Sequence, residues 1–298
     1  MKHAFMVICH NNIEVLKAQM GILDSDTSDF YIHIDKGAQL DSQEIENAVS
    51  KSRVYFLESK KIKWGHFSQV ECELRLLSAA VQGEYDYYHL LSGVDMPIKT
   101  YKAIDQFFEA NAGREFVHFD TLAPSSLFID RIDTYNLFPG RSDFMRKCNG
   151  LFVRMQKLLN IHRLKNKGYV VQKGCNWFSI THKLASDIVD QIDELRRQYH
   201  YSFCGDEVFL QTFVFNSSHR DNLYNKNFND DYHSCMRMID WERGNPYIYR
   251  IEDIELLLES DFLFARKFDY AMDREIVKKL VDRLVSDDEK SIYYNTCI

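Results

Sequence analysis

The first hundred residues alternate between short apolar segments, typical of buried strands, and longer segments with helical periodicity. Strands separated by helical segments form right-handed β-α-β units, and such units build a mostly parallel sheet. The sequence therefore predicts an α/β fold of Rossmann type, with helices flanking the sheet. The expected elements are strand 5–9, helix 13–23, strand 30–34, strand 54–57, helix 67–82 and strand 87–91.

The second half of the chain has a less regular pattern. The turn residues Cys204-Gly205-Asp206 are expected to cap and open a helix. No internal repeat or shift in composition divides the chain, so one domain over 1–298 is the simplest organisation. The expected elements are helices 144–160, 183–197, 207–215, 251–259 and 274–285, with a strand at 177–181.

The composition narrows the class of protein. With 45% hydrophobic and 14% aromatic residues, the chain can bury a substantial core, which excludes global disorder. It carries 37 Lys and Arg against 44 Asp and Glu, a net charge of −7. An acidic balance argues against a nucleic-acid-binding protein but leaves room for a local cationic pocket.

Membrane and export signals are not evident in the sequence. No apolar run approaches the length of about 18–20 residues that a membrane span requires. The short apolar segment at the N-terminus continues into His10-Asn11-Asn12 rather than a cleavage site, so we interpret it as the first strand of the mature protein. Seven scattered cysteines without a C-x-x-C pair favour reduced thiols. We therefore expect a cytoplasmic location.

Ligands of parallel sheets bind at the carboxyl ends of the strands, here His10, Asp35 and the segment 92–95. A dinucleotide fold needs G-x-G-x-x-G after the first strand, and His10-Asn11-Asn12 stands there instead, so a NAD or FAD enzyme is not expected. A P-loop is also absent from the sequence. Asp35 could hold a ribose hydroxyl or a base edge, or could simply cap the turn before Gly37.

Other motifs allow both functional and structural interpretations. Trp64 follows the basic stretch 60–63 and could stack on a base or pack in the core. The strand-end turn Ser92-Gly93-Val94-Asp95 could contact a ligand or form an ordinary loop before Pro97. Asp206 could act only as a helix cap, which leaves Glu207 as the informative acid.

Taken together, these segments resemble the core-2/I-branching β-1,6-N-acetylglucosaminyltransferases, glycosyltransferase family 14, which also contains peptide O-xylosyltransferases. The resemblance extends over roughly residues 3–270. It implies a GT-A-like fold, an inverting mechanism, a UDP-sugar donor, and no cofactor or divalent metal. The matching segments are 32–35 (IHID), 64–67 (WGHF), 90–100 (LLSGVDMPIKT), 176–179 (NWFS), 205–207 (GDE) and 264–269 (FARKFD).

The resemblance also implies roles for individual residues. Glu207 matches the general base, and Arg250 and Lys267 match two cations that neutralise the donor diphosphate. The remaining matches are Asp35 and Trp64 for the uridine, Ser92, Gly93 and Asp95 for the strand-end loop at the donor sugar, and Trp241, Arg131 and Trp177 for the acceptor. The implied division is a nucleotide-binding half (1–110), an acceptor and catalytic half (111–270) and a helical C-terminal extension (271–298).

The sequence departs from the family pattern in several places. The animal members have a membrane anchor, a stem and several disulfides, none of which we expect in this sequence. Ser92 stands where some relatives have a cysteine. The region 120–170 matches poorly, so the acceptor does not carry over. We expect a bacterial-type member that transfers N-acetylglucosamine to a surface polysaccharide or glycolipid, with peripheral membrane contact allowed and no nucleic-acid partner. The alternatives are a UDP-xylose-dependent xylosyltransferase and a non-catalytic nucleotide-sugar-binding protein.

Overall fold

The computed structural model describes residues 1–123, 126–138, 142–164, 168 and 170–285. Its main sheet has six strands in the order β3-β2-β1-β4-β7-β6. The first four strands in that order are parallel, and β7 runs antiparallel to both neighbours. The predicted α/β class, with a mostly parallel sheet flanked by helices, is confirmed. The strands are β1 (His3–Cys9), β2 (Ser28–Ile34), β3 (Arg53–Phe56), β4 (Tyr87–Ser92), β6 (Phe116–Val117) and β7 (Phe178–Thr181).

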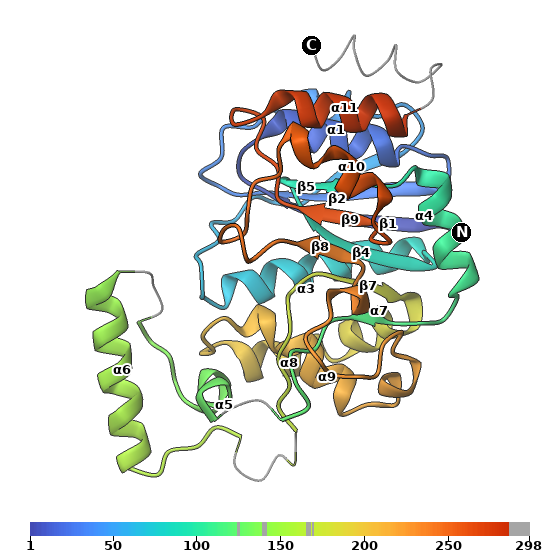
Figure 1. Cartoon of the computed structure of the whole chain (residues 1–298). Helices are drawn as coiled ribbons and strands as arrows, with labels where there is room; N and C mark the ends of the chain where they lie inside the picture. The colour runs from blue at the N-terminus through green and yellow to red at the C-terminus, as the bar shows by residue number, and fades with distance from the viewer. Residues whose placement is uncertain (124–125, 139–141, 165–167, 169, 286–298) are drawn as a thin grey trace.

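Helices cover both faces of this sheet, as Figure 1 shows. The alternation of side chains along β1 explains why: Phe5 and Val7 pack in one apolar cluster with residues of α1 (Ile13–Leu23), and Ala4 and Met6 pack in another with residues of α3 (Ser68–Ala80). A strand buried on both faces is apolar throughout, which is the pattern that the sequence shows. Three further elements complete this half: α2 (Ser42–Glu46), η1 (Val81–Gly83) and α4 (Tyr101–Ala110).

A second sheet, which the sequence did not predict, has three short strands in the order β5-β9-β8. These are β5 (Asp95–Pro97), β8 (Arg237–Ile239) and β9 (Phe264–Arg266). Arg237 joins the two sheets: its buried guanidinium donates to the Phe178 carbonyl (2.7 Å) and the Ser179 hydroxyl (2.8 Å), and it lies over the Phe264 ring. The strand β5 belongs to the predicted nucleotide-binding half and β9 to the other half, so this sheet joins them.

The predicted helices of the second half are present, with corrections at their boundaries. The single helix expected at 183–197 is two helices, with Gln191 between them at φ −103° and ψ 15°. The helices expected from residues 207 and 251 each begin later, because a 3₁₀ turn precedes them. The elements are α5 (Ser126–Asp133), α6 (Asp143–Leu158), α7 (His182–Asp190), α8 (Ile192–Tyr199), η2 (Gly205–Glu207), α9 (Phe209–Phe215), η3 (Ser218–Asn222), η4 (Tyr232–Ser234), η5 (Ile251–Asp253), α10 (Ile254–Glu259) and α11 (Arg274–Leu284).

The expected C-terminal extension is part of the fold as far as the structure describes it. Ile276, Val277 and Leu280 of α11 are buried in one cluster with Val15 and Ala18 of α1. Residues 286–298 of the predicted extension lie outside the described residues. Within the described part of the chain, no helix is both long and apolar enough to cross a bilayer, and the six cysteines found there are all free thiols.

Candidate active site

The carboxyl ends of β1 and β4 meet the segment that follows β9. The Gly93 N–H donates to the Ile8 carbonyl (3.0 Å), and the Phe268 N–H donates to the Val94 carbonyl (2.9 Å). A Cβ atom on Gly93 would lie 2.7 Å from the Cβ of Cys9, so only glycine permits this close approach of the two loops. Lys267, next to Phe268 in the chain, therefore lies at the sheet edge where a ligand was expected.

Asp35 forms both a turn cap and a longer-range contact. One carboxylate oxygen accepts the Gly37 N–H (2.9 Å), which is the structural role that the sequence allowed. The other oxygen accepts the Ile62 N–H (2.7 Å) and so holds the segment that leads to Trp64 beside the end of β2. The Trp64 side chain is 44% exposed and lies edge-on to the Phe203 ring at 5.6 Å. The alternative that Trp64 is a core residue is therefore wrong.

Gly65 connects this loop to the segment that carries Glu207. Its carbonyl accepts the Cys204 N–H (3.0 Å). Its φ is +72°, and a Cβ there would lie 2.7 Å from the Phe203 ring, so a side chain would separate the two segments. Trp64, predicted to bind the uridine, thus precedes a residue that is hydrogen-bonded to the loop of the predicted general base.

Glu207 ends the 3₁₀ turn η2, and its side chain is 36% exposed. One carboxylate oxygen accepts a hydrogen bond from Arg131 on α5 (2.7 Å), and the Lys173 ammonium lies 3.9 Å from the same oxygen. The sequence predicted a helix N-terminus as the positive neighbour of this carboxylate, but α9 begins only at Phe209. Two cationic side chains perform that function instead.

Asp206, expected to be a helix cap, is buried beneath the site and accepts a hydrogen bond from Gln69 (2.8 Å). Burial, together with the charge of Glu207, raises the pKa of Asp206 to about 7. Burial also raises the pKa of Glu73 well above its usual value, and the charge of Asp206 adds to that effect. Asp206 and Glu73 are thus two buried acids near one another that the sequence analysis did not assign to the site.

The raised pKa of Asp206 predicts a pH dependence of stability. As the pH rises from about 4 to about 7, the unfolded chain releases this proton and the native state keeps it, so stability falls through that window. Between pH 5 and pH 8 the loss should be about 3 kcal/mol. In Asp206→Asn the contribution of this residue should disappear, because an amide does not ionise, and only the smaller loss due to other buried acids such as Glu73 should remain. Urea unfolding of both proteins at both pH values measures the difference; parallel changes in the two proteins would contradict it.

The strand-end loop forms a network around Asp95. The carboxylate accepts hydrogen bonds from the Ser92 N–H (2.7 Å), the Ser92 hydroxyl (2.9 Å) and the Arg266 guanidinium (2.7 Å). Arg266 also lies over the Trp177 ring, 4.6 Å from its centre. The structure thus brings Ser92, Asp95 and Trp177 together through Arg266. The sequence analysis did not assign Arg266 to the site, although the matching segment 264–269 contains it.

Arg250 and Lys267 lie on neighbouring backbone segments. The Tyr249 N–H donates to the Lys267 carbonyl (3.0 Å), and the Arg250 guanidinium donates to the Met272 carbonyl (2.6 Å). The two cations predicted to face a diphosphate therefore come from adjacent chain segments, one of which borders the ends of β1 and β4.

Trp241 is 51% exposed, and its indole N–H donates to the Tyr232 hydroxyl (3.0 Å). The Tyr232 ring stacks on the His118 ring, with 4.3 Å between their centres. Burial lowers the pKa of His118, and Lys173 lies close enough for its charge to lower that pKa further. Through these intermediates Trp241 is connected to the surroundings of Glu207. The structure gives no contact between Trp241 and Arg131 among the described residues.

Among the described residues, His118, Asp120 and Asp230 could offer ligand atoms to a metal ion within 4.8 Å of one another. The hydrogen bonds of His118 and Asp120 do not fit this use. His118 accepts the Cys175 N–H at Nδ1 (3.0 Å), which places the ring proton on Nε2, toward Asp230. Asp120 accepts a hydrogen bond from Lys173 (2.5 Å). The expectation that the reaction needs no metal remains a prediction.

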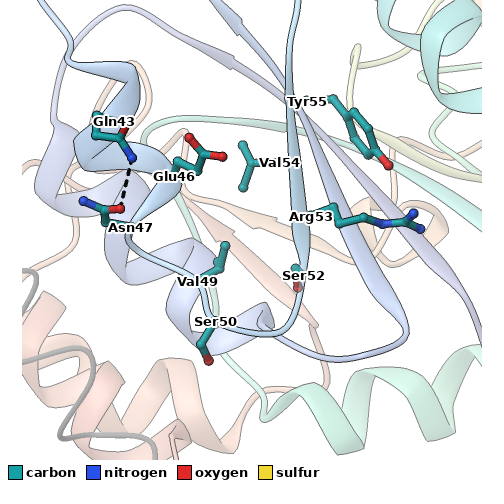
Figure 2. A pocket seen from close by; sticks show the side chains of 9 residues that line it. All are labelled: Gln43, Glu46, Asn47, Val49, Ser50, Ser52, Arg53, Val54 and Tyr55. Carbon is teal, nitrogen blue, oxygen red and sulfur yellow. Dashed lines mark hydrogen bonds between the residues drawn. The ribbon is translucent and has the colours of Figure 1, made fainter.

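Two other regions of the molecule lie apart from these residues. A concavity of about 940 Å³ lies beside β3, and the residues that line it, all between 43 and 55, include none of the predicted site residues (Figure 2). The one Asp-x-Asp sequence, residues 24–26, lies at the amino end of β2, where the Asp24 carboxylate accepts N–H groups of Ser50 and Ser52. Asp24 therefore has a structural role in a loop, away from the carboxyl ends of the strands.

The comparison with protein families decides which kind of protein this is: a family model described as Core-2/I-Branching enzyme matches residues 3–258. The chain belongs to the core-2/I-branching family of glycosyltransferases. The family predicted from the sequence is thereby confirmed.

Curated relatives of this chain are xylosyltransferases. A Ciona intestinalis xylosyltransferase is 23% identical over 309 residues, which cover 95% of this chain and 34% of that protein. Rat xylosyltransferase 1 is 22% identical, with 84% and 31% covered, and human xylosyltransferase 1 is 23% identical, with 84% and 27% covered. The chain thus spans about a third of these relatives. Mouse xyloside xylosyltransferase 1, a solved structure, aligns at 11% identity with a TM-score of 0.36, over 89% of this chain and 96% of that one.

Proposed function

We propose that this chain is an inverting glycosyltransferase that moves a sugar from a UDP-sugar to a hydroxyl group of a glycan or glycolipid. The observation that carries the proposal is the placement of Glu207. Its carboxylate is bound by Arg131, and its side chain is partly exposed. The loop that carries it is hydrogen-bonded through Cys204 to Gly65, the residue after Trp64. Family membership supports the same assignment.

In this mechanism Glu207 accepts the proton of the acceptor hydroxyl as that oxygen attacks the anomeric carbon from the face opposite UDP. Arg131 binds one carboxylate oxygen, and the carboxyl group has a second oxygen that can take the proton. Arg250 and Lys267 are proposed to neutralise the departing diphosphate, the first by directed hydrogen bonds and the second as a point charge. Trp177, Arg131 and Trp241 are proposed to contact the acceptor.

The donor sugar has two candidates. N-acetylglucosamine was expected from the resemblance, and the names of the curated relatives favour xylose. The two sugars differ in a hydroxymethyl and an N-acetyl group. Thermal unfolding with a panel of UDP-sugars, followed by UDP release with glycan acceptors, tests the proposal, because stabilisation by a ligand follows its affinity. UDP binding with neither transfer nor donor hydrolysis across a broad acceptor panel would favour a non-catalytic binding protein.

The uridine site gives a separate prediction. If Trp64 stacks on the base, Trp64→Ala should weaken the binding of UDP itself by about five- to hundredfold, because base stacking on an aromatic ring contributes about 1–3 kcal/mol. Asp35→Ala should also weaken UDP binding, since it removes a carboxylate and releases the Ile62 segment. Calorimetry with UDP measures both. Leu256→Ala, on an exposed residue of α10, is the control; unchanged affinity in both test variants would assign them structural roles only.

A further inference from the structure

Helix α6 presents apolar side chains to solvent. Figure 1 shows α6 at the periphery of the molecule, away from the two sheets. Phe144, Leu151, Met155 and Leu158 are 77%, 63%, 50% and 87% exposed. Their spacing of seven, four and three residues places all four on one face of the helix. A surface helix normally turns such a stripe toward the core, so α6 has the reverse orientation.

Polar side chains on another face fix this orientation. Gln156 is buried and pairs with Tyr135, accepting its N–H (2.8 Å) and donating to its carbonyl (2.9 Å). Asn149 donates to the Asn136 side chain (2.8 Å). Beside these contacts, Leu137 and Phe138 are 48% and 45% exposed. The helix is thus attached through its amides, and its apolar stripe, which we call the α6 stripe (Phe144, Leu151, Met155, Leu158), faces outward.

The charge around the α6 stripe is opposite to that of the whole protein. Helix α6 contains four Lys and Arg and one Asp, in a chain with a net charge of −7. On the helical projection Lys147 and Arg154 border one side of the stripe, and Arg146 and Lys157 lie on the opposite side of the helix. An outward apolar stripe with basic residues beside it is typical of helices that lie in the interface of an anionic membrane.

We propose that the α6 stripe docks on the surface of an anionic lipid bilayer, with the apolar side chains in the acyl boundary and the flanking cations at the headgroups. A second copy that docked through the same stripe would bring its Lys147 and Arg154 against those of this chain, and like charges repel; an anionic bilayer offers the opposite charge along the whole stripe. The basic residues would reach headgroups through their long aliphatic stems.

This surface is physically connected to the candidate active site. Lys157 of α6 donates to the Asp130 carboxylate of α5 (2.5 Å), and the next residue of α5, Arg131, binds Glu207. A docked α6 would therefore place the acceptor side of the site near the bilayer, and the acceptor class would be a membrane-borne saccharide. This consequence rests on the proposed glycosyl transfer, whereas membrane binding does not.

The test is sedimentation of the full chain with vesicles, without donor or acceptor. Binding is expected to vesicles that contain about a third phosphatidylglycerol, with much weaker binding to phosphatidylcholine alone, and should fall in high salt. Leu151→Glu combined with Leu158→Glu should abolish it. Leu256→Glu, a similarly exposed leucine on α10, is the matched control and should bind as the unaltered chain does.

The cationic contribution is tested separately. Each basic residue near an anionic surface changes the partition coefficient by about fivefold, so Lys147→Gln combined with Arg154→Gln should weaken binding by about twenty-five-fold. These side chains are exposed, and unaltered thermal unfolding of each variant verifies that it folds.

Three outcomes would overturn the proposal: no binding to anionic vesicles, equal binding by the Leu151 and Leu158 variant, or a concentration-dependent dimer lost in that variant without vesicle binding. The last result would assign the α6 stripe to a second copy of the chain. If the protein binds vesicles but transfers no sugar, the proposed docking surface stands and only the proposed function is rejected.

Discussion

Glu207→Gln should lower the rate of sugar transfer by roughly two to four orders of magnitude, the contribution of a positioned general base. Glutamine has nearly the same size and can still accept the hydrogen bond from Arg131, but it cannot take a proton at neutral pH. The fold and the affinity for UDP should therefore remain. Initial rates of UDP release with a saturating acceptor, together with calorimetry for UDP, separate the two effects.

Two controls make this experiment selective. Glu109→Gln changes an exposed glutamate on α4 and should leave transfer unaltered. Arg131→Ala removes the partner of Glu207, and the increase in the acceptor KM should exceed the decrease in kcat if Arg131 binds the acceptor, as the resemblance implies. A correctly folded Glu207→Gln protein with near-normal turnover would remove Glu207 from the mechanism.

Arg250→Ala and Lys267→Ala should each reduce transfer by about two to three orders of magnitude, the effect of removing one group that stabilises developing charge. Transfer by the unaltered chain should persist in EDTA, and Mn²⁺ should not rescue either variant. Apart from the group of His118, Asp120 and Asp230, two carboxylates stand in motifs that could suggest a metal site, and both have other partners: Asp24 accepts the N–H groups of a loop, and Asp95 accepts hydrogen bonds from Arg266.

Lys279→Ala, on an exposed lysine of α11, is the matched control for loss of one positive charge. Rates with the unaltered chain are measured after dialysis against EDTA and again after Mn²⁺ is added. A loss of activity in EDTA that Mn²⁺ restores would contradict both the metal-independent mechanism and the role of the two cations.

The local pattern was sufficient to predict most of the main sheet. The helix expected at 13–23 has the observed bounds, and the four expected parallel strands lie within one or two residues of theirs. Each of these elements is encoded by its own apolar periodicity. The break at Gln191 was not predictable in this way, because the apolar pattern continues through both α7 and α8.

Features that depend on distant pairing were missed. Each strand of the second sheet has three residues, too few for a periodic signal, and β5 is a strand because β9 pairs with it. The burial of Asp206 has the same cause, since Gln69 covers it from another helix. The hydrogen bond between Arg131 and Glu207 joins two residues that the family resemblance assigned to the site, and composition and spacing alone did not indicate this contact.

The pairing of β5 with β9 also has a consequence for the order of folding. Asp95 and Arg266 are separated by 171 positions, yet they form one partly buried ion pair just after the end of β4. Closing so long a loop is entropically costly, and proteins dominated by such contacts fold slowly. Until residue 266 has left the ribosome, Asp95 lacks its partner, the Arg266 guanidinium. The parallel strands can therefore assemble before the strand-end loop is complete. The proposed donor site should therefore be among the last parts of the molecule to form.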